Sequence, residues 1–141
     1  MKTLVVTAVA GLAFALQAPV GIACGYCVED KIASVYDHAV ITRALAQKHH
    51  VAFFALDGTP PRGANARRAL EQLVETTAGV DAGGARVSIE NASLAVAFDP
   101  ARVPYPVLMR QLQKALARVR LIPQPLRLMD RPADLKALVR S

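Results

Sequence analysis

The chain has 141 residues, of which 53% are hydrophobic, 20% are charged and 5% are aromatic. This length suits one domain, and the composition excludes whole-chain disorder, a collagen-like repeat or a coiled coil. The net charge of +6 is uneven, because residues 101–141 contain nine basic and two acidic residues. Since these basic residues are not interleaved with aromatic residues and form no recognisable nucleic-acid motif, we interpret the excess as a solvated basic face and expect no nucleic-acid partner.

Residues 1–23 have the three parts of a secretory signal peptide. Lys2 precedes a short apolar run, and Gly21 and Ala23 place small residues before a cleavage point at Cys24. The run is shorter than the ~20 residues of a membrane-spanning helix, so we expect a removed signal and no membrane span afterwards. A lipid anchor on Cys24 and an uncleaved anchor are the alternatives. The prediction is a periplasmic or secreted protein in an oxidising compartment.

The segment 24–48 is predicted to be a helix that begins with a C-x-x-C pair. Its apolar residues recur at helical spacing with no Pro or Gly between them: Val28, Ile32, Val35, Ala39, Leu45 and Ala46. We therefore expect one continuous helix from Val28 to about Lys48, packed on a core through this stripe. One flank of the stripe would carry Cys27, Lys31, His38 and His49. The acidic residues would face solvent: Glu29, Asp30 and Asp37.

The rest of the chain alternates between strand and helix patterns. The predicted elements are a buried strand Val51–Leu56, a helix Ala64–Thr77, a hairpin of strands Ala85–Ile89 and Ser93–Phe98, a helix Pro104–Val119, an edge strand Leu121–Leu128 and a terminal helix Asp130–Val139 with Asp130 as its N-cap. Pro123 and Pro125 restrict the last strand to an edge. The order β-α-β-β-α-β predicts an α+β, ferredoxin-like sandwich preceded by the C-x-x-C helix. The expected divisions are 1–23, 24–48, 49–129 and 130–141.

Three marks in this order resemble the heavy-metal-associated domain family of copper chaperones, mercury-binding proteins and metal-pumping ATPases. They are Gly58 after the first strand, Gly79-Val80 after the first helix, and Asp99-Pro100 after the hairpin. The resemblance covers about residues 51–128. It implies a ferredoxin-like fold and binding of a soft metal ion.

One departure from that family affects the site itself. The family carries G-M-x-C-x-x-C after the first strand, and the matching positions here are Gly63 and Ala66. The segment Gly58–Ala66 (GTPPRGANA) contains no Cys, Met or His. The family's metal loop is therefore lost, and any metal chemistry must lie elsewhere.

The strongest site candidate is Cys24-Gly25-Tyr26-Cys27. At a helix start, free N–H groups and the helix dipole lower the pKa of a thiol, and two thiolates at this spacing bind Cu(I), Zn(II) or Hg(II). An idle disulfide and a dithiol–disulfide exchange site are alternatives. A thioredoxin-type enzyme would need a strand that leads into the cysteine pair. In this chain the predicted signal peptide ends directly before the pair, so that fold is not expected. Glu29 and Asp30, placed in the same first turn, would oppose thiolate formation, and Lys31 would offset them in part.

His38 is a further ligand candidate. On a continuous helix it lies about 16 Å along the axis from Cys27, whereas ligands of one tetrahedral Zn lie within about 4 Å of one another. One metal ion could bind both Cys27 and His38 only if the helix broke between them. The third ligand is therefore left open between the new α-amine of Cys24, a residue of the folded domain and a thiol of a partner.

Other chemically active residues are interpreted as structural. They are the solvated helix end His49-His50, the triplet Tyr36-Asp37-His38, whose members diverge on a helix, and the packing residues Met109 and Met129. No Ser-His-Asp pattern, nucleotide loop or carboxylate pair is recognisable, so an enzyme is not the favoured interpretation.

The sequence thus predicts an exported module that binds a soft metal ion through Cys24 and Cys27. It would pass the ion to a metal transporter or acceptor protein. A thiol–disulfide oxidoreductase using the same pair and a metal-free interaction domain are the competing interpretations.

Overall fold

Four helices and four strands make up the computed structural model, which describes residues 25–134. They are α1 (Gly25–Ser34), α2 (His38–Ala46), β1 (His50–Gly58), α3 (Ala66–Glu75), β2 (Val80–Ser88), β3 (Ser93–Phe98), α4 (Tyr105–Ala117) and β4 (Leu121–Met129). The strands form one antiparallel sheet in the order β2-β3-β1-β4. This is the ferredoxin-like arrangement, so the predicted fold class is confirmed.

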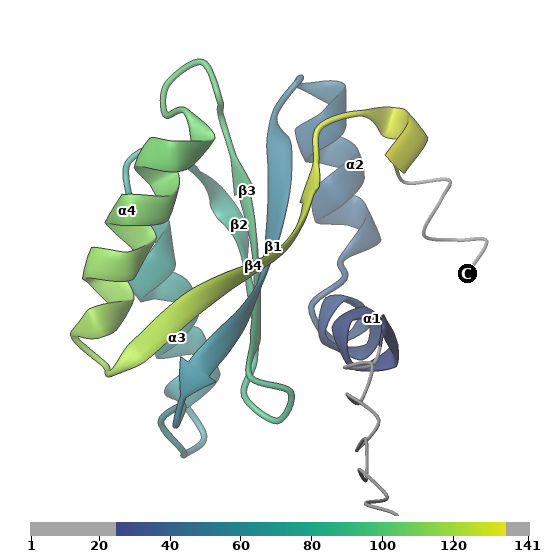
Figure 1. Ribbon diagram of the computed structural model, residues 1–141. Helices are drawn as coiled ribbons and strands as arrows, with labels where there is room; N and C mark the ends of the chain where they lie inside the picture. The colour runs from purple at the N-terminus through teal and green to yellow at the C-terminus, as the bar shows by residue number, and fades with distance from the viewer. Residues whose placement is uncertain (1–24, 135–141) are drawn as a thin grey trace, which may run out of the picture.

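Helices cover both faces of the sheet. Figure 1 shows α3 and α4 on one side and α1 and α2 on the other, so the molecule has three layers. Each face of the sheet therefore has a core of its own. No helix of the described part, residues 25–134, is long and apolar enough to cross a membrane.

The first core lies between the sheet and the pair α3 and α4. From β1, Ala52, Phe54 and Leu56 point into it. The helices contribute residues spaced by three or four positions: Leu70, Val74, Leu108, Leu112 and Leu116. Burial of each such large side chain contributes about 1.5–3 kcal/mol. Met109 packs at the margin of this core, as predicted.

The second core lies between the sheet and the pair α1 and α2. Val51 and Phe53 of β1 and Met129 of β4 face it, so the prediction of Met129 as a packing residue is confirmed. The side chains that α1, α2 and the residues between them contribute to this core are Ile32, Val35, Val40, Ile41, Ala44 and Leu45. Because β1 is buried on both faces, its sequence is a continuous apolar run and not an alternating pattern.

The expected continuous helix from Val28 to Lys48 is wrong. The chain leaves the helix after Ser34 and begins a new one at His38. Asp37 is extended (φ −127°), and its side chain accepts a hydrogen bond from the backbone N–H of Val40 at 3.1 Å, which makes it the N-cap of α2. Since α2 starts a new helical phase, Ala39 and Ala46 are exposed, contrary to the predicted stripe.

The remaining elements agree with the prediction except at some ends. β2 begins at Val80, before the predicted start, and its pairing with β3 is irregular between Val80 and Ala85. β4 is an edge strand, as its prolines predicted. Residues 132–134 are helical, and the rest of the expected terminal helix lies outside the described residues. The side chain of Asp134, and not of Asp130, accepts the backbone N–H groups there.

Candidate functional site

The second cysteine of the C-x-x-C pair lies in the first turn of α1. The helix begins at Gly25, so the backbone of Cys27 is helical, as expected for a C-x-x-C at a helix start. Cys24 and the side chain of Cys27 lie outside what the structure describes. The surroundings of the pair are therefore defined by the rest of α1.

Polar contacts fix α1 to the sheet beyond its first turn. The Lys31 ammonium donates hydrogen bonds to the carbonyl oxygens of Asn91 and Ala92, in the turn between β2 and β3. The hydroxyl of Ser34 lies 2.7 Å from that of Ser93. Together with the burial of Ile32, these contacts hold α1 at the end of the sheet where the hairpin turns (Figure 1).

The predicted environment of the thiols needs a correction. Glu29 does not lie in the first turn of α1. Its carboxylate is not free in solvent, because it forms an ion pair with the guanidinium of Arg127 on β4. Asp30 is exposed, as expected. A paired carboxylate has less influence on a neighbouring thiolate than a free one, so the opposition expected from Glu29 is weaker than the sequence indicated.

His38 is the first residue of α2 and is exposed. Its Nδ1 lies 3.3 Å from the Tyr36 hydroxyl and its Nε2 3.5 Å from the Thr42 hydroxyl. The helix break removes the distance argument that separated His38 from Cys27. Among the side chains that the structure describes, which do not include that of Cys27, no group of three or more His, Cys, Asp or Glu is arranged to hold a metal ion.

Asp37 is part of a structural contact, contrary to the expectation that it faces solvent. Its Oδ2 lies 2.8 Å from Nε of Arg86 on β2. The backbone N–H of Val40 holds the pKa of Asp37 below its usual value, and Arg86 lowers it further, while partial burial acts the other way. The triplet Tyr36-Asp37-His38 is thus structural, as predicted, although it lies at a helix break.

His49 was not predicted to have a partner. Its Nδ1 lies 2.9 Å from Asp81, and its Nε2 lies 3.8 Å from Asp99. His50 packs edge-on against the ring of Phe98. The interpretation of His49-His50 as a solvated helix end is therefore wrong, and no local pattern reveals a partner 32 positions away.

The predicted flank of Cys27, Lys31, His38 and His49 does not form. Lys31 lies at the hairpin end of β2, and His49 lies at the opposite end, where β2 begins. The break before α2 changes the direction of the chain between them. The flank was a consequence of the continuous helix and fails with it.

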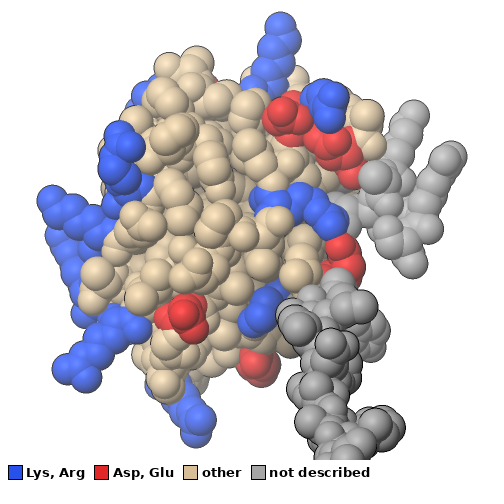
Figure 2. Space-filling view, viewed as in Figure 1, with Lys and Arg blue, Asp and Glu red and all other residues tan. Residues whose placement is uncertain are grey.

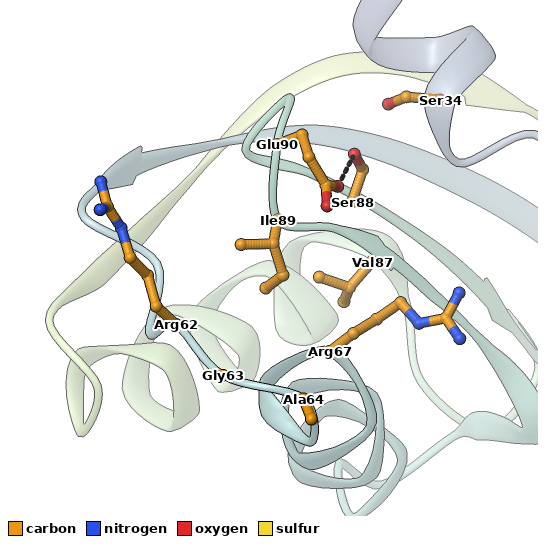
Figure 3. Close-up of a pocket in the computed structure, with 9 residues that line it drawn as sticks. All are labelled: Ser34, Arg62, Gly63, Ala64, Arg67, Val87, Ser88, Ile89 and Glu90. Atoms are coloured by element: carbon orange, nitrogen blue, oxygen red, sulfur yellow. Dashed lines mark hydrogen bonds between the residues drawn. The ribbon is translucent and has the colours of Figure 1, made fainter.

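The segment Gly58–Ala66, which begins at the end of β1, borders a cavity of about 420 Å³. Figure 3 shows Arg62, Gly63 and Ala64 along one side of it, with Glu90 hydrogen-bonded to Ser88 on another. The guanidinium groups of Arg62 and Arg67 point in different directions (Figure 3). The described residues that line it include no thiol, thioether or imidazole group, which are the ligands that soft metal ions prefer.

The three marks of the family resemblance have structural roles in this fold. A Cβ atom at Gly58 would lie 2.5 Å from the carbonyl oxygen of Arg120, so the strand end and the turn before β4 approach each other closely. The backbone N–H of Asp99 donates to the carbonyl of Gly79 at 2.9 Å, and its side chain accepts from Ala101. These marks follow from the fold and do not by themselves indicate a metal.

Comparison with known proteins gives matches among solved structures alone. No protein-family model and no curated protein matches the sequence. Oxidized MerP from Ralstonia metallidurans CH34 is 17% identical to this chain, with a TM-score of 0.43. The match covers 55% of this chain and 96% of the MerP chain. A copper binding domain of HMA7, a P-type ATPase, is 18% identical with a TM-score of 0.44 over 56% of this chain and 96% of its own. The CopZ metallochaperone is 19% identical with a TM-score of 0.41 over 52% and 97%.

Proposed function

We propose that this chain is exported and binds one soft metal ion through the thiolates of Cys24 and Cys27. The observation that carries the proposal is that Cys27, the second cysteine of the C-x-x-C pair, lies in the first turn of α1. There the free backbone N–H groups and the positive end of the helix dipole favour thiolate over thiol. Thiolates are the ligands that Cu(I), Zn(II) and Hg(II) prefer. Transfer to a transporter or acceptor protein is the role we assign to it.

The position of α1 supports a site on a helix that is fixed to the sheet. Lys31 and Ser34 attach the second half of the helix to the sheet, while Cys27 lies in the half before these contacts. A pair of thiolates fills only two of the four positions around a tetrahedral Zn(II) ion. The α-amine of Cys24 after signal removal, or a thiol of the acceptor, would supply the next ligand, and the second of these makes transfer a ligand exchange.

The alternative function is thiol–disulfide exchange by the same pair. The helix-start position favours it for the same reason as metal binding, because both need a thiolate. Asp30 is exposed and lies three positions after Cys27, and none of the described residues forms an ion pair with it. We therefore expect the pKa of Cys27 to lie below the free value of about 8.5 and above the value of about 3.5 found in strongly oxidising exchange proteins.

Competition for Cu(I) with a chromophoric chelator tests the proposal on the reduced protein that starts at Cys24. We expect one ion per chain, and at least a tenfold loss of affinity for either Cys24→Ser or Cys27→Ser, because one thiolate is removed. His38→Ala serves as the matched control and should change affinity little. Repeated oxidation of a reduced unfolded substrate, together with a thiol pKa near 4, would instead identify an exchange enzyme.

A further inference from the structure

A histidine lies between two carboxylates at the end of the sheet opposite the hairpin turn. His49 directly precedes β1, Asp81 is the second residue of β2, and Asp99 directly follows β3. The imidazole Nδ1 lies 2.9 Å and 3.0 Å from the two carboxylate oxygens of Asp81, and Nε2 lies 3.8 Å from Oδ2 of Asp99. The three side chains are 22%, 18% and 22% exposed, so the cluster is mostly enclosed but open to water.

The contact with Asp81 determines which nitrogen of His49 can bind a cation. A carboxylate accepts hydrogen bonds and donates none, so the proton of a neutral imidazole is assigned to Nδ1. Nε2 then has a free lone pair, and it faces a carboxylate oxygen of Asp99. These two acceptors repel each other unless a cation lies between them.

The distance of 3.8 Å decides which cation fits between Nε2 and Oδ2 of Asp99. It exceeds the range of about 2.7–3.2 Å for an N–H···O hydrogen bond, so a proton on Nε2 does not close the gap. Zinc forms bonds of about 2.0–2.2 Å to imidazole nitrogen and carboxylate oxygen. Two such bonds span about 3.4 Å at the tetrahedral angle and about 4.2 Å when collinear, so one metal ion can reach both atoms.

Other hydrogen bonds hold both groups in position. Asp81 orients the ring of His49, and Oδ1 of Asp99 accepts the backbone N–H of Ala101 at 2.9 Å. The backbone N–H of Asp99 in turn donates to the carbonyl of Gly79. In metal sites the far nitrogen of a ligating histidine commonly donates to a carboxylate, which fixes the ring and makes it more basic. Asp81 has the position of that outer carboxylate.

No basic side chain of the described residues neutralises the two carboxylates. Among these residues, no Lys or Arg forms an ion pair with Asp81 or Asp99. Figure 2 shows Lys and Arg side chains along the side of the molecule where α4 lies in Figure 1. With a neutral imidazole the cluster has two negative charges, and largely enclosed charges are normally paired or bound to a metal. A divalent cation would balance them.

We propose that Nε2 of His49 and Oδ2 of Asp99 bind Zn(II), with Asp81 as the outer carboxylate. Imidazole and carboxylate are zinc ligands, whereas Cu(I) prefers thiolates, so this site differs in chemistry from the cysteine pair. Water fills the remaining positions around the ion. This agrees with the partial exposure of the cluster and with the finding that the described side chains include no group of three His, Cys, Asp or Glu arranged for a metal. The inference is independent of the cysteine pair.

Zinc titration of a Cys24→Ser/Cys27→Ser parent tests the proposal without the thiolates. Competition with a chromophoric zinc chelator measures the affinity of this parent, which starts at residue 24. We expect one Zn(II) per chain, and at least ~10-fold weaker binding after His49→Ala or Asp99→Asn, because each removes one of the two protein ligands. Asp81→Asn should weaken binding about 10–100-fold through loss of the outer carboxylate.

Two matched controls and one spectrum locate the ion. His38→Ala and Asp30→Asn remove an imidazole and a carboxylate at exposed positions of α2 and α1, and each should change zinc affinity less than ~3-fold. Long-range ¹H–¹⁵N correlation reports the protonation of each histidine nitrogen. At about pH 8, where imidazole is neutral, His49 of the zinc-free parent should have its proton on Nδ1. Zinc should then shift the Nε2 resonance of His49 and leave those of His38 unchanged.

Three outcomes would overturn the proposal. Equal zinc affinity in the parent and in its His49→Ala and Asp99→Asn forms would place the ion elsewhere. An equal loss in His38→Ala would mean that exposed histidines bind zinc in general. An Nε2 resonance of His49 that does not move at saturating zinc would exclude it as a ligand. Far-UV circular dichroism confirms folding, and Asp99→Asn, which keeps the size of the side chain and an acceptor for Ala101, decides the result if His49→Ala unfolds.

Discussion

The break between α1 and α2 should depend on the side chain of Asp37. Asp37→Ala removes the N-cap of α2, which costs about 0.5–2 kcal/mol, and also the ion pair with Arg86. The two side chains of that pair are 30% and 36% exposed, so the pair adds only about 0.2–1 kcal/mol. We therefore expect a total loss of about 1–3 kcal/mol in the free energy of unfolding.

Asp37→Asn separates the two contributions. Asn is as good an N-cap as Asp, so this variant keeps the cap, loses the charge and should cost about 0.2–1 kcal/mol. Urea unfolding at neutral pH measures both losses, and Asp30→Ala, at an exposed position of α1, is the control, with a change within about 0.5 kcal/mol. If Asp37→Ala cost no more than Asp30→Ala, Asp37 would not set the break and our explanation of the two helices would be wrong.

The same residue makes a prediction about pH. The pKa of Asp37 is lowered in the folded state, chiefly by the N–H of Val40. The unfolded chain then binds the proton more readily, so the contribution of Asp37 is complete above the unfolded pKa of about 3.9 and is lost as pH falls through the folded value. The stability difference between wild type and Asp37→Asn should therefore shrink below about pH 4 and stay constant above about pH 5. A difference that grew toward acid would contradict this sign.

Three further predictions concern other parts of the chain. Gly58→Ala should lower the free energy of unfolding in urea more than Gly63→Ala does. Both glycines have positive φ, but a new Cβ would meet the carbonyl of Arg120 at Gly58 and nothing within 4 Å at Gly63. Equal losses of stability would contradict the close approach at Gly58. Gly63→Cys with Ala66→Cys should add a second soft-metal site to the loop, and unchanged stoichiometry would question the register of the family resemblance. The intact mass of the exported protein should equal that of a chain that starts at Cys24. A mass that includes residues 1–23 would exclude cleavage, and a mass increased by acyl chains would indicate a lipoprotein.

Local patterns in the sequence were sufficient for most of the ferredoxin-like part. β3 was predicted with its observed bounds, and α4 within two residues at each end, because apolar period and turn residues carry that information locally. The burial of β1 was also predicted from its unbroken apolar run. What this run could not show is that α1 and α2 supply the second cover, because that contact joins residues distant in sequence.

The errors at the N-terminal helices have one cause. With no Pro or Gly between Val28 and Lys48, the apolar period favoured a single helix, and Asp37 was interpreted as a solvent-facing residue of that helix although it is the N-cap of α2. The partner of Asp37 on β2 and the partners of His49 are set by tertiary structure. The contacts of α1 with β4 and with the turn between β2 and β3 could not be predicted from a helix whose course was wrong.

X-ray absorption at the zinc edge tests the central claim most directly. The sample is the Zn(II)-loaded protein that starts at Cys24, compared with its Cys24→Ser/Cys27→Ser form. Our account predicts two sulfur neighbours at about 2.3 Å in the first sample and none in the second. A zinc ion surrounded by nitrogen and oxygen alone, with the same spectrum in both samples, would contradict binding by the cysteine pair.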